Sequence, residues 1–450
     1  MLSKEVINKY NVASPRYTSY PTILHWNKME FTSAELGAQL TRSFLISNDT
    51  KTSVYVHLPY CESLCTFCGC HKHITKNHTV EKPYIDAVID EWKMVNRLSP
   101  STLTVEELHL GGGTPTFFSA EELKRLVEAI TIGSAEVKNF SFEGHPNHTS
   151  FDQLKILFDL GFRRVSFGVQ DYDPKVQKAI NRVQEFETVK RVTDQARAIG
   201  YESVSHDLVF GLPFQNLNCM RKSIALTLSL MPDTISLYSY AHVPWIKGTG
   251  QRGFSEADIP SGKTKRELYE YAKKELLEAG YEEIGMDHFG LPNEKMTIAM
   301  HEKKLHRNFM GYTTSSTNRL IGLGVSAISE HDFGYAQNVK SVKEYLQTIA
   351  KNKIPVFKGH VHSAKDKMMK KHILSLMCNL ETEYCPNSVL QEKEANFKSI
   401  LKSFENDGII EWEGRKIKMT EDGKPFVRNV CMSIDPYMKE NQGERFSKSI

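Results

Sequence analysis

The stretch YVHLPYCESLCTFCGC, residues 55–70, carries three cysteines, Cys61, Cys65 and Cys68, on one short segment. It directly follows an apolar run that predicts a buried β-strand over 53–59. Cysteine thiolates are the usual ligands of [4Fe–4S] clusters, and a cluster held by only three of them keeps one iron free. The spacing C-x3-C-x2-C therefore indicates a [4Fe–4S] cluster whose open iron can take a substrate or cofactor.

A zinc site and unligated thiols are the alternatives. Cys70 could be a fourth zinc ligand, and His57, His71 and His73 are close in sequence. Structural zinc sites normally draw their ligands from two separated halves, and Cys70 follows Cys68 too closely to share one tetrahedral ion comfortably. A disulfide framework is disfavoured, because eight cysteines in 450 residues are sparse. The cluster is the favoured interpretation.

The composition is that of an ordinary globular protein, with 25% charged and 40% hydrophobic residues. A net charge of +3, with basic and acidic residues interleaved, gives no indication of a nucleic-acid partner. The longest uncharged apolar stretch, 223–232, is far shorter than the roughly 20 residues that span a bilayer. The start MLSKEVINKY has no apolar core of a signal peptide. We therefore expect a cytoplasmic protein with no membrane partner.

The middle of the chain alternates strand-like and helix-like segments. The predicted strands are Ser53–Pro59, Glu107–Leu110, Asn139–Glu143, Arg164–Gln170, Ser203–Phe210 and Thr234–His242. The predicted helices are Val80–Asn96, Ala120–Ile130, Phe151–Leu160, Glu185–Ile199 and Cys219–Leu230. Such alternation implies right-handed crossovers and a parallel sheet. We predict an α/β fold, a partial TIM-like (β/α) barrel of about six parallel strands.

Polar or glycine clusters follow the predicted strands. They are Gly111–Pro115, Glu143–Pro146, Gln170–Asp171, Gly211–Pro213 and Tyr240–His242, in addition to the cysteine segment. In a barrel of parallel strands the carboxyl ends meet on one face, which is where active sites lie. We therefore expect these clusters to converge on one site.

The two flanking regions differ from the barrel. Residues 1–50 are predicted to be an irregular segment that covers the substrate, because PRYTSYPT at 15–22 is rich in prolines and aromatics. The barrel domain is predicted over 51–355. Residues 356–450 are predicted to form a mainly helical domain that contains a β-hairpin near 408–419.

The cysteine motif, with Phe67 before its third cysteine and GGGTP at 111–115, resembles the radical S-adenosylmethionine (SAM) superfamily. Longer strings narrow the match to the oxygen-independent coproporphyrinogen III oxidase family. They are PRYTSYPT (15–22), GVQDY (168–172), HDLVFGLP (206–213), YAH (240–242), GMDHF (285–289), LHRNFMGYTT (305–314) and GVSAIS (324–329). The resemblance runs from about residue 8 to the C-terminal FSKSI.

The resemblance implies that the three cysteines bind a [4Fe–4S] cluster and that SAM occupies the open iron. The residues implied for this first SAM are Tyr55, Gly112, Glu143 and Ile328. A second SAM is implied beside it, with Phe67, Gly113, Thr114, Gln170, Arg182, Asp207 and Ala241. These residue types suit the ligand, because carboxylates accept hydrogen bonds from hydroxyl and ammonium groups and an arginine pairs with a carboxylate.

The implied reaction is oxidative decarboxylation of two propionates of coproporphyrinogen III to vinyl groups, giving protoporphyrinogen IX in haem biosynthesis. A 5′-deoxyadenosyl radical made from SAM would abstract hydrogen from the propionate β-carbon. An electron donor and an electron acceptor are required, and a monomer is the default expectation. The substrate carries four carboxylates, so we name Arg16 and Arg307 as candidate substrate contacts.

Two positions depart from the family pattern. His145 stands where an acidic residue is expected, and Leu110 stands where an aromatic is expected. Cys70 matches an extra family cysteine that is not expected to bind the cluster. A haem-binding chaperone of the same superfamily is the alternative function. PRYTSYPT and the C-x-C at Cys68 and Cys70 favour the enzyme, since such chaperones lack both.

Overall fold

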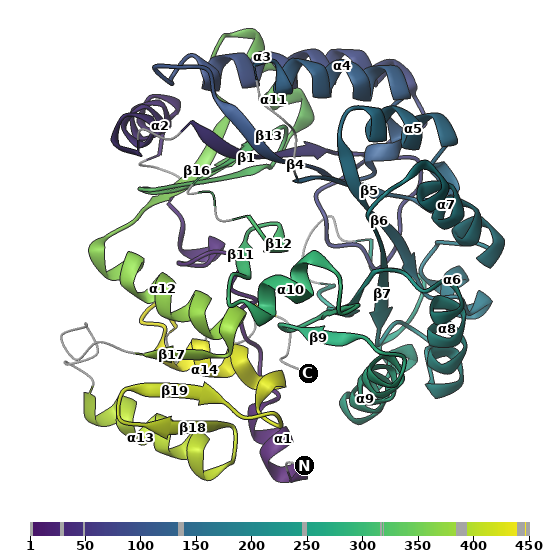
Figure 1. The fold of residues 1–450 in the computed structure, drawn as a ribbon, viewed down its shortest axis with the longest axis vertical. Coiled ribbons are helices and arrows are strands. Elements are labelled where there is room, and N and C mark those ends of the chain that lie inside the picture. Colours follow the sequence, from purple (N-terminus) through teal and green to yellow (C-terminus); the bar gives the residue numbers. More distant parts are fainter. Residues whose placement is uncertain are drawn as a thin grey trace.

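A curved sheet of twelve strands forms the centre of the computed structural model, which describes residues 3–27, 31–47, 50–133, 139–244, 250–315, 317, 319–383, 394–438 and 446 (Figure 1). The strand order across the described sheet is β16-β15-β14-β13-β1-β4-β5-β6-β7-β8-β10-β9. Neighbours from β13 to β8 are parallel: β13 (Leu320–Leu323), β1 (Lys51–Leu58), β4 (Thr104–Gly112), β5 (Asn139–Gly144), β6 (Phe162–Gln170), β7 (Ser203–Phe210) and β8 (Thr234–Ser239). The predicted partial barrel of six consecutive parallel strands is confirmed.

Antiparallel strands extend both edges of the sheet, and the sequence patterns did not reveal them. They are β14 (Ile328–His331), β15 (Gly334–Asn338) and β16 (Val356–Val361) on one side, and β10 (His288–Gly290) and β9 (Glu282–Ile284) on the other. Most have only three to five residues, which is too short to show a clear periodicity.

Helices cover the outer, convex face of the sheet (Figure 1). They are α3 (Glu81–Asn96), α4 (Ala120–Thr131), α5 (Phe151–Asp159), α6 (Pro174–Ala179), α7 (Phe186–Ile199), α8 (Leu217–Leu230) and α9 (Gly262–Glu278). Helix α4 illustrates why they form: the Ser119 hydroxyl accepts a hydrogen bond from the Glu122 N–H at its start. Its residues 123, 126, 127 and 130 recur at helical spacing and are fully buried.

Small side chains on the inner face keep the barrel hollow. Ser141, Ser166, Ser205 and Ser236 face inward on the four consecutive strands β5–β8 and line a cavity. Bulky residues at neighbouring positions, such as Phe140, face the helices instead. Barrel interiors are usually filled by branched side chains, so this serine layer is what leaves room for ligands.

The first 50 residues contain two helices that the prediction of an irregular segment overlooked, α1 (Lys4–Tyr10) and α2 (Ser33–Ser47). Leu36, Leu40 and Phe44 of α2 recur every four residues and are buried in the core of the barrel. The segment 15–22 between them is not helical, as predicted.

The C-terminal region packs against the N-terminal segment. It contains α12 (Ala364–Asn379), α13 (Glu394–Asn406), α14 (Val427–Ile434) and a small sheet of β17 (Glu381–Glu383), β18 (Ile410–Glu413) and β19 (Lys416–Met419). The predicted hairpin is confirmed by β18 and β19. Tyr10, Tyr17 and Tyr20 lie in the same apolar core as residues of α12 and α14. The domain boundaries at 50 and 355 stay predictions, and β16 beyond 355 still belongs to the large sheet.

Two shorter helices, a parallel strand pair (β2 with β3) and an antiparallel pair (β11 with β12) are also described. They are α10 (Lys295–His301), α11 (Val342–Ala350), β2 (Tyr60–Cys61), β3 (His73–Ile74), β11 (His306–Asn308) and β12 (Gly311–Thr313). Across the part of the chain that is described, no helix has both the length and the apolar character needed to cross a bilayer.

Candidate active site

The three predicted cluster cysteines lie together on the loop after β1. Two of the sulfurs have polar neighbours: the Thr114 hydroxyl donates to Cys61 Sγ at 3.2 Å, and Arg182 Nη1 lies 3.7 Å from Cys65 Sγ. Interaction with the Cys70 thiol and the charge of Lys72 lower the pKa of Cys68 to about 6. Burial raises the pKa of Cys61 to about 11, so this thiol ionises only when a metal takes its sulfur. The donor set fits a thiolate-bound cluster.

A glycine turn at the end of β4 lies directly against this loop. A Cβ atom on Gly113 would stand 2.5 Å from the Pro59 carbonyl oxygen, and the Gly113 N–H donates to the Leu58 carbonyl at 2.8 Å. Gly112 has φ of +118°, a region that favours glycine. Its N–H donates to Glu143 Oε2 at 3.2 Å. The turn therefore needs glycine for close approach, as the sequence indicated.

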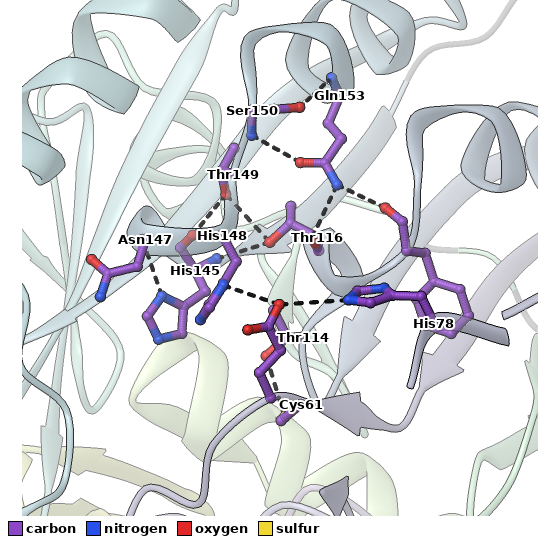
Figure 2. Close-up of polar contacts among 12 residues, drawn as sticks. Cys61, His78, Thr114, Thr116, His145, Asn147, His148, Thr149, Ser150 and Gln153 are labelled. Carbon is purple, nitrogen blue, oxygen red and sulfur yellow. Dashed lines mark hydrogen bonds and ion pairs between the residues drawn. The ribbon is translucent and has the colours of Figure 1, made fainter. Parts of the chain in front are cut away.

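Polar contacts behind Cys61 connect the ends of β4 and β5 (Figure 2). The Thr116 hydroxyl accepts hydrogen bonds from the His145 N–H and the Thr149 hydroxyl, each at 3.3 Å. Gln153 Nε2 donates to the Thr116 carbonyl at 3.0 Å. Because these bonds join two neighbouring turns, the carboxyl ends of the strands are held in one fixed arrangement beside the cysteine loop.

Arg182 connects the cysteine loop to β6. Its Nη2 donates to the Gly168 carbonyl at 2.6 Å, and a Cβ on Gly168 would stand 2.8 Å from Nη2 and 2.7 Å from Gln170 Nε2. Gly168 thus leaves the space in which Arg182 and Gln170 lie side by side. Arg182 itself lies between α6 and α7, and Gly168, which accepts its hydrogen bond, pairs with Asp207 of β7 in the sheet.

An open cavity of about 140 Å³ lies inside the barrel. Glu143 and Asp207 line its upper part, and burial raises the pKa of Asp207 to about 6, partly offset by hydroxyl groups of Ser236 and Ser166. Residues that the sequence analysis did not single out also line it: His109, Arg164, Tyr238, His288, Met310 and Tyr312.

Arg16 and Arg307 meet although 291 residues separate them. Arg307 Nη2 donates to the Arg16 carbonyl at 3.3 Å, and the Arg307 guanidinium lies 4.5 Å from the ring centre of the cavity residue Tyr312. Arg16 Nη1 forms a 2.6 Å ion pair with Asp287. Arg307 is 5% exposed, and its Nε has no hydrogen-bond partner among the described residues. Arg307 is therefore the less compensated of these two predicted cations.

Comparison with known proteins explains this arrangement. Residues 55–227 match the model of the Radical SAM superfamily. The chain is 35% identical to an oxygen-independent coproporphyrinogen III oxidase of Helicobacter pylori, over 99% of both chains, and 34% identical to one of Escherichia coli, over 99% of this chain and 98% of the other. The solved structure of the Escherichia coli coproporphyrinogen III oxidase, a radical SAM enzyme, superposes with a TM-score of 0.88 at 33% identity and covers 95% of this chain and all of that one.

The chain belongs to the oxygen-independent coproporphyrinogen III oxidase family. It is a radical SAM oxidoreductase, and a [4Fe–4S] cluster and SAM are its cofactors. This settles the choice between a cluster and zinc in favour of the cluster. The relatives named here are oxidases, so the comparisons do not favour the haem-chaperone alternative.

Of the residues predicted around SAM, Glu143 and Asp207 line the described cavity, and the others lie on β1, on the cysteine loop, near strand ends or between α6 and α7. The Tyr55 hydroxyl and His57 Nδ1 share a hydrogen bond of 3.0 Å. Phe67 packs against the apolar cluster that contains Tyr240, the residue before Ala241. Ile328 begins β14 in a core with Trp26 and Tyr335, and a Cβ on Gly322, the strand partner of Tyr55, would stand 2.3 Å from its carbonyl oxygen. The individual SAM contacts stay predictions.

The two departures from the family pattern have local effects. Leu110 is fully buried in the core behind the glycine turn. His145 Nδ1 accepts a hydrogen bond from the Asn147 N–H at 3.2 Å (Figure 2). Burial and the charge of Arg182 hold the pKa of His145 far below its usual value, so the ring is neutral. The neutral His145 ring therefore stands near Arg182, at the position where the family pattern predicts an acidic side chain.

Proposed function

We propose that this protein converts coproporphyrinogen III to protoporphyrinogen IX by oxidative decarboxylation of two propionates, without molecular oxygen. The proposal is supported by the full-length similarity to oxygen-independent coproporphyrinogen III oxidases. The observation that carries it here is the barrel cavity, which is lined by Glu143, Asp207 and Tyr312, with the Arg307 guanidinium against the Tyr312 ring. Carboxylate acceptors for SAM and a nearby guanidinium for substrate carboxylates suit a porphyrinogen with acidic arms.

The cofactors supply the radical chemistry: when bound, the reduced cluster and SAM provide the radical that abstracts hydrogen from the propionate β-carbon, leaving methionine and 5′-deoxyadenosine. The electrons balance if each SAM takes one electron from a donor. Each substrate arm then loses one hydrogen atom, CO2 and one electron, which an acceptor must take. The donor, the acceptor and a monomeric state stay predictions.

The chain's own residues hold these groups and exclude water. Cys61, Cys65 and Cys68 are the proposed cluster ligands. Tyr55, Gly112, Glu143 and Ile328 are proposed for the first SAM. Phe67, Gly113, Thr114, Gln170, Arg182, Asp207 and Ala241 are proposed for a second SAM. Arg16 and Arg307 are proposed for substrate carboxylates. Glu143 and Asp207 are the two carboxylates that can accept hydrogen bonds from the hydroxyl or ammonium groups of SAM.

An anaerobic assay tests the function. The reconstituted protein is mixed with SAM, coproporphyrinogen III, a low-potential reductant and an electron acceptor, and the products are followed by mass spectrometry. We expect protoporphyrinogen IX and 5′-deoxyadenosine together. If 5′-deoxyadenosine forms without decarboxylation while the protein binds haemin tightly and stoichiometrically, the chaperone replaces the oxidase.

The Asp207 carboxyl makes SAM binding depend on pH. Its pKa is raised by burial from 3.8 to about 6, so the group is protonated below pH 6 and loses an acceptor for SAM hydroxyls. We expect the Kd for SAM of the holoenzyme to rise as the pH falls from 7 to 5. Asp207→Asn should have a Kd about ten-fold higher at pH 7, for one charge-assisted hydrogen bond, and little change with pH. Equal pH profiles for the two proteins would contradict the assignment.

A further inference from the structure

Asp171 is a fully buried carboxylate that the proposed mechanism does not use. It follows Gln170 directly at the end of β6, and 0% of its surface is exposed. A buried charge needs hydrogen bonds that replace its lost hydration. Asp171 Oδ1 accepts a hydrogen bond of 2.6 Å from the Asp173 N–H, and Oδ2 accepts one of 2.7 Å from Gln215 Nε2. Both oxygens are acceptors, which is the pattern of an ionised carboxylate, and one of them binds a side chain 44 residues further along the chain.

Gln215 uses its whole amide group in the turn after β7. Its Oε1 accepts hydrogen bonds from the N–H groups of Gly211, at 2.6 Å, and of Leu212, at 3.3 Å. Its Nε2 donates to the Val209 carbonyl at 3.0 Å in addition to Asp171. The Asp171–Gln215 hydrogen bond, which we call the strand-end bridge, therefore joins the turn after β6 to the turn after β7.

The strand-end bridge acts where the pairing of the two strands becomes irregular. Gly168 pairs with Asp207 of β7, but the register shifts between Gly168 and Gln170. Gln170 has a φ of +70°, in the left-handed region that a residue with a side chain adopts only at a cost in free energy. Such a conformation persists where the surrounding structure holds it. The bridge begins at the next residue and is therefore in place to hold Gln170.

The backbone of Asp171 also supports the loop that carries Arg182. Gln177 of α6 donates from Nε2 to the Asp171 carbonyl at 2.9 Å, and the Gln177 carbonyl accepts from the Arg182 N–H at 2.8 Å. Gln177 is itself buried. Gln170 and Arg182 lie side by side in the space that Gly168 leaves. The placement of both side chains therefore depends on the turn at Asp171.

We propose that Asp171 and Gln215 position the second SAM, because the strand-end bridge holds Gln170 and Arg182 in place relative to Asp207 of β7. This inference rests on the proposed function, in which these three residues bind the second SAM. The polar atoms of Asp171 and Gln215 are bonded within the protein, so the two are positioning residues and not ligands of SAM. The residues proposed for the first SAM lie on β1, β4, β5 and β14, which the bridge does not join. The bridge should therefore affect one SAM and not the other.

Equilibrium dialysis of the reconstituted holoenzyme against radiolabelled SAM, without reductant, measures both sites. We expect the wild type to bind a first and a second SAM. In Asp171→Asn an NH2 group replaces one carboxylate oxygen, so either the Asp173 N–H or Gln215 Nε2 loses its acceptor. The Kd of one SAM should rise about ten- to a hundred-fold, because a hydrogen bond to a charged group is lost, and the other Kd should not change. In the decarboxylation assay the KM for SAM should rise, while kcat at saturating SAM is kept.

Asp173→Asn is the matched control. It removes a carboxylate from the same turn, and asparagine caps a helix as well as aspartate, whose side chain here accepts from the Lys175 and Val176 N–H groups of α6. Both Kd values should be those of the wild type. An equal rise of both Kd values in Asp171→Asn, or no change in either, would overturn the inference. A wild type that binds one SAM only would also overturn it, whereas decarboxylation by that protein would leave the proposed function intact.

Hydrogen exchange in the wild-type holoenzyme tests the strand-end bridge without a substitution, and it decides the question if iron content or Tm shows that Asp171→Asn is not loaded or folded. Coupling between two sites is reciprocal, so a bridge that stabilises bound SAM is itself stabilised by SAM. The N–H groups of Asp173, Gly211 and Leu212 donate to the two bridge residues. We expect their exchange to slow about ten-fold as the second SAM binds. Unchanged exchange at saturating SAM would show that the bridge does not support that site.

Discussion

Cys65→Ser is expected to abolish both cluster binding and decarboxylation. Cys65 is buried at the centre of the loop, and only three thiolates hold the cluster in this account. A serine hydroxyl does not ionise at neutral pH and is a poor iron ligand. After reconstitution, iron analysis should give about four irons per wild-type chain and close to none in the variant. Formation of 5′-deoxyadenosine and of protoporphyrinogen IX should both fall to background.

Cys70→Ala is the control for this experiment. Cys70 lies on the same loop, two residues after Cys68, but is not a proposed ligand. The variant should keep its iron and show at least residual SAM cleavage, because Cys70 acts on the Cys68 thiol and not on the cluster. Loss of iron from Cys70→Ala to the same extent as from Cys65→Ser would mean that four cysteines bind the metal and that no iron is open.

Gly113→Ala is expected to disrupt the site through the backbone. The added methyl group would stand 2.5 Å from the oxygen and 2.6 Å from the carbon of the Pro59 carbonyl, and neither atom can turn away as a side chain could. Overpacking of this kind costs about 1–3 kcal/mol and here would displace the strand end that leads into Cys61. We expect a Tm lower by a few degrees, poor iron retention and at least ten-fold lower activity, measured on reconstituted protein.

Gly69→Ala provides the comparison. Gly69 lies between Cys68 and Cys70, and a Cβ there would meet no atom within 4 Å. Iron content, Tm and activity should match the wild type. If both alanine variants behave alike, the close contact at Pro59 does not control the cysteine loop.

The parallel strands could be predicted from sequence because most carry β-branched or aromatic residues and end near glycine or a polar cluster. Ser203–Phe210 has the predicted bounds, and Asn139–Gly144 differs by one residue. Short edge strands such as His288–Gly290 could not be predicted, because three residues carry no periodic signal and their pairing is decided by distant partners. Helix α2 did carry a signal in Leu36, Leu40 and Phe44, spaced by four, which went unrecognised.

The candidate site was predictable where its residues are contiguous in sequence. The cysteine loop and the glycine turn are of this kind. The group formed by Arg16, Arg307 and Arg428 could not be predicted, because its members are far apart in sequence. Arg16 and Arg307 meet across 291 residues, and Arg428 of α14 lies near both. Arg164 could have been found: counting back in steps of two from Gln170 along the predicted strand places it on the same face.

Transfer of deuterium from the substrate to 5′-deoxyadenosine tests most directly the claim that the protein acts on the propionate β-carbons. Coproporphyrinogen III deuterated at the β-carbons of its propionates is incubated anaerobically with the reconstituted protein, SAM and reductant, and the 5′-deoxyadenosine is analysed by mass spectrometry. The account predicts deuterium in 5′-deoxyadenosine, in proportion to the vinyl groups formed. Unlabelled 5′-deoxyadenosine accompanied by unchanged substrate would contradict it, because the protein would then cleave SAM without acting on a propionate.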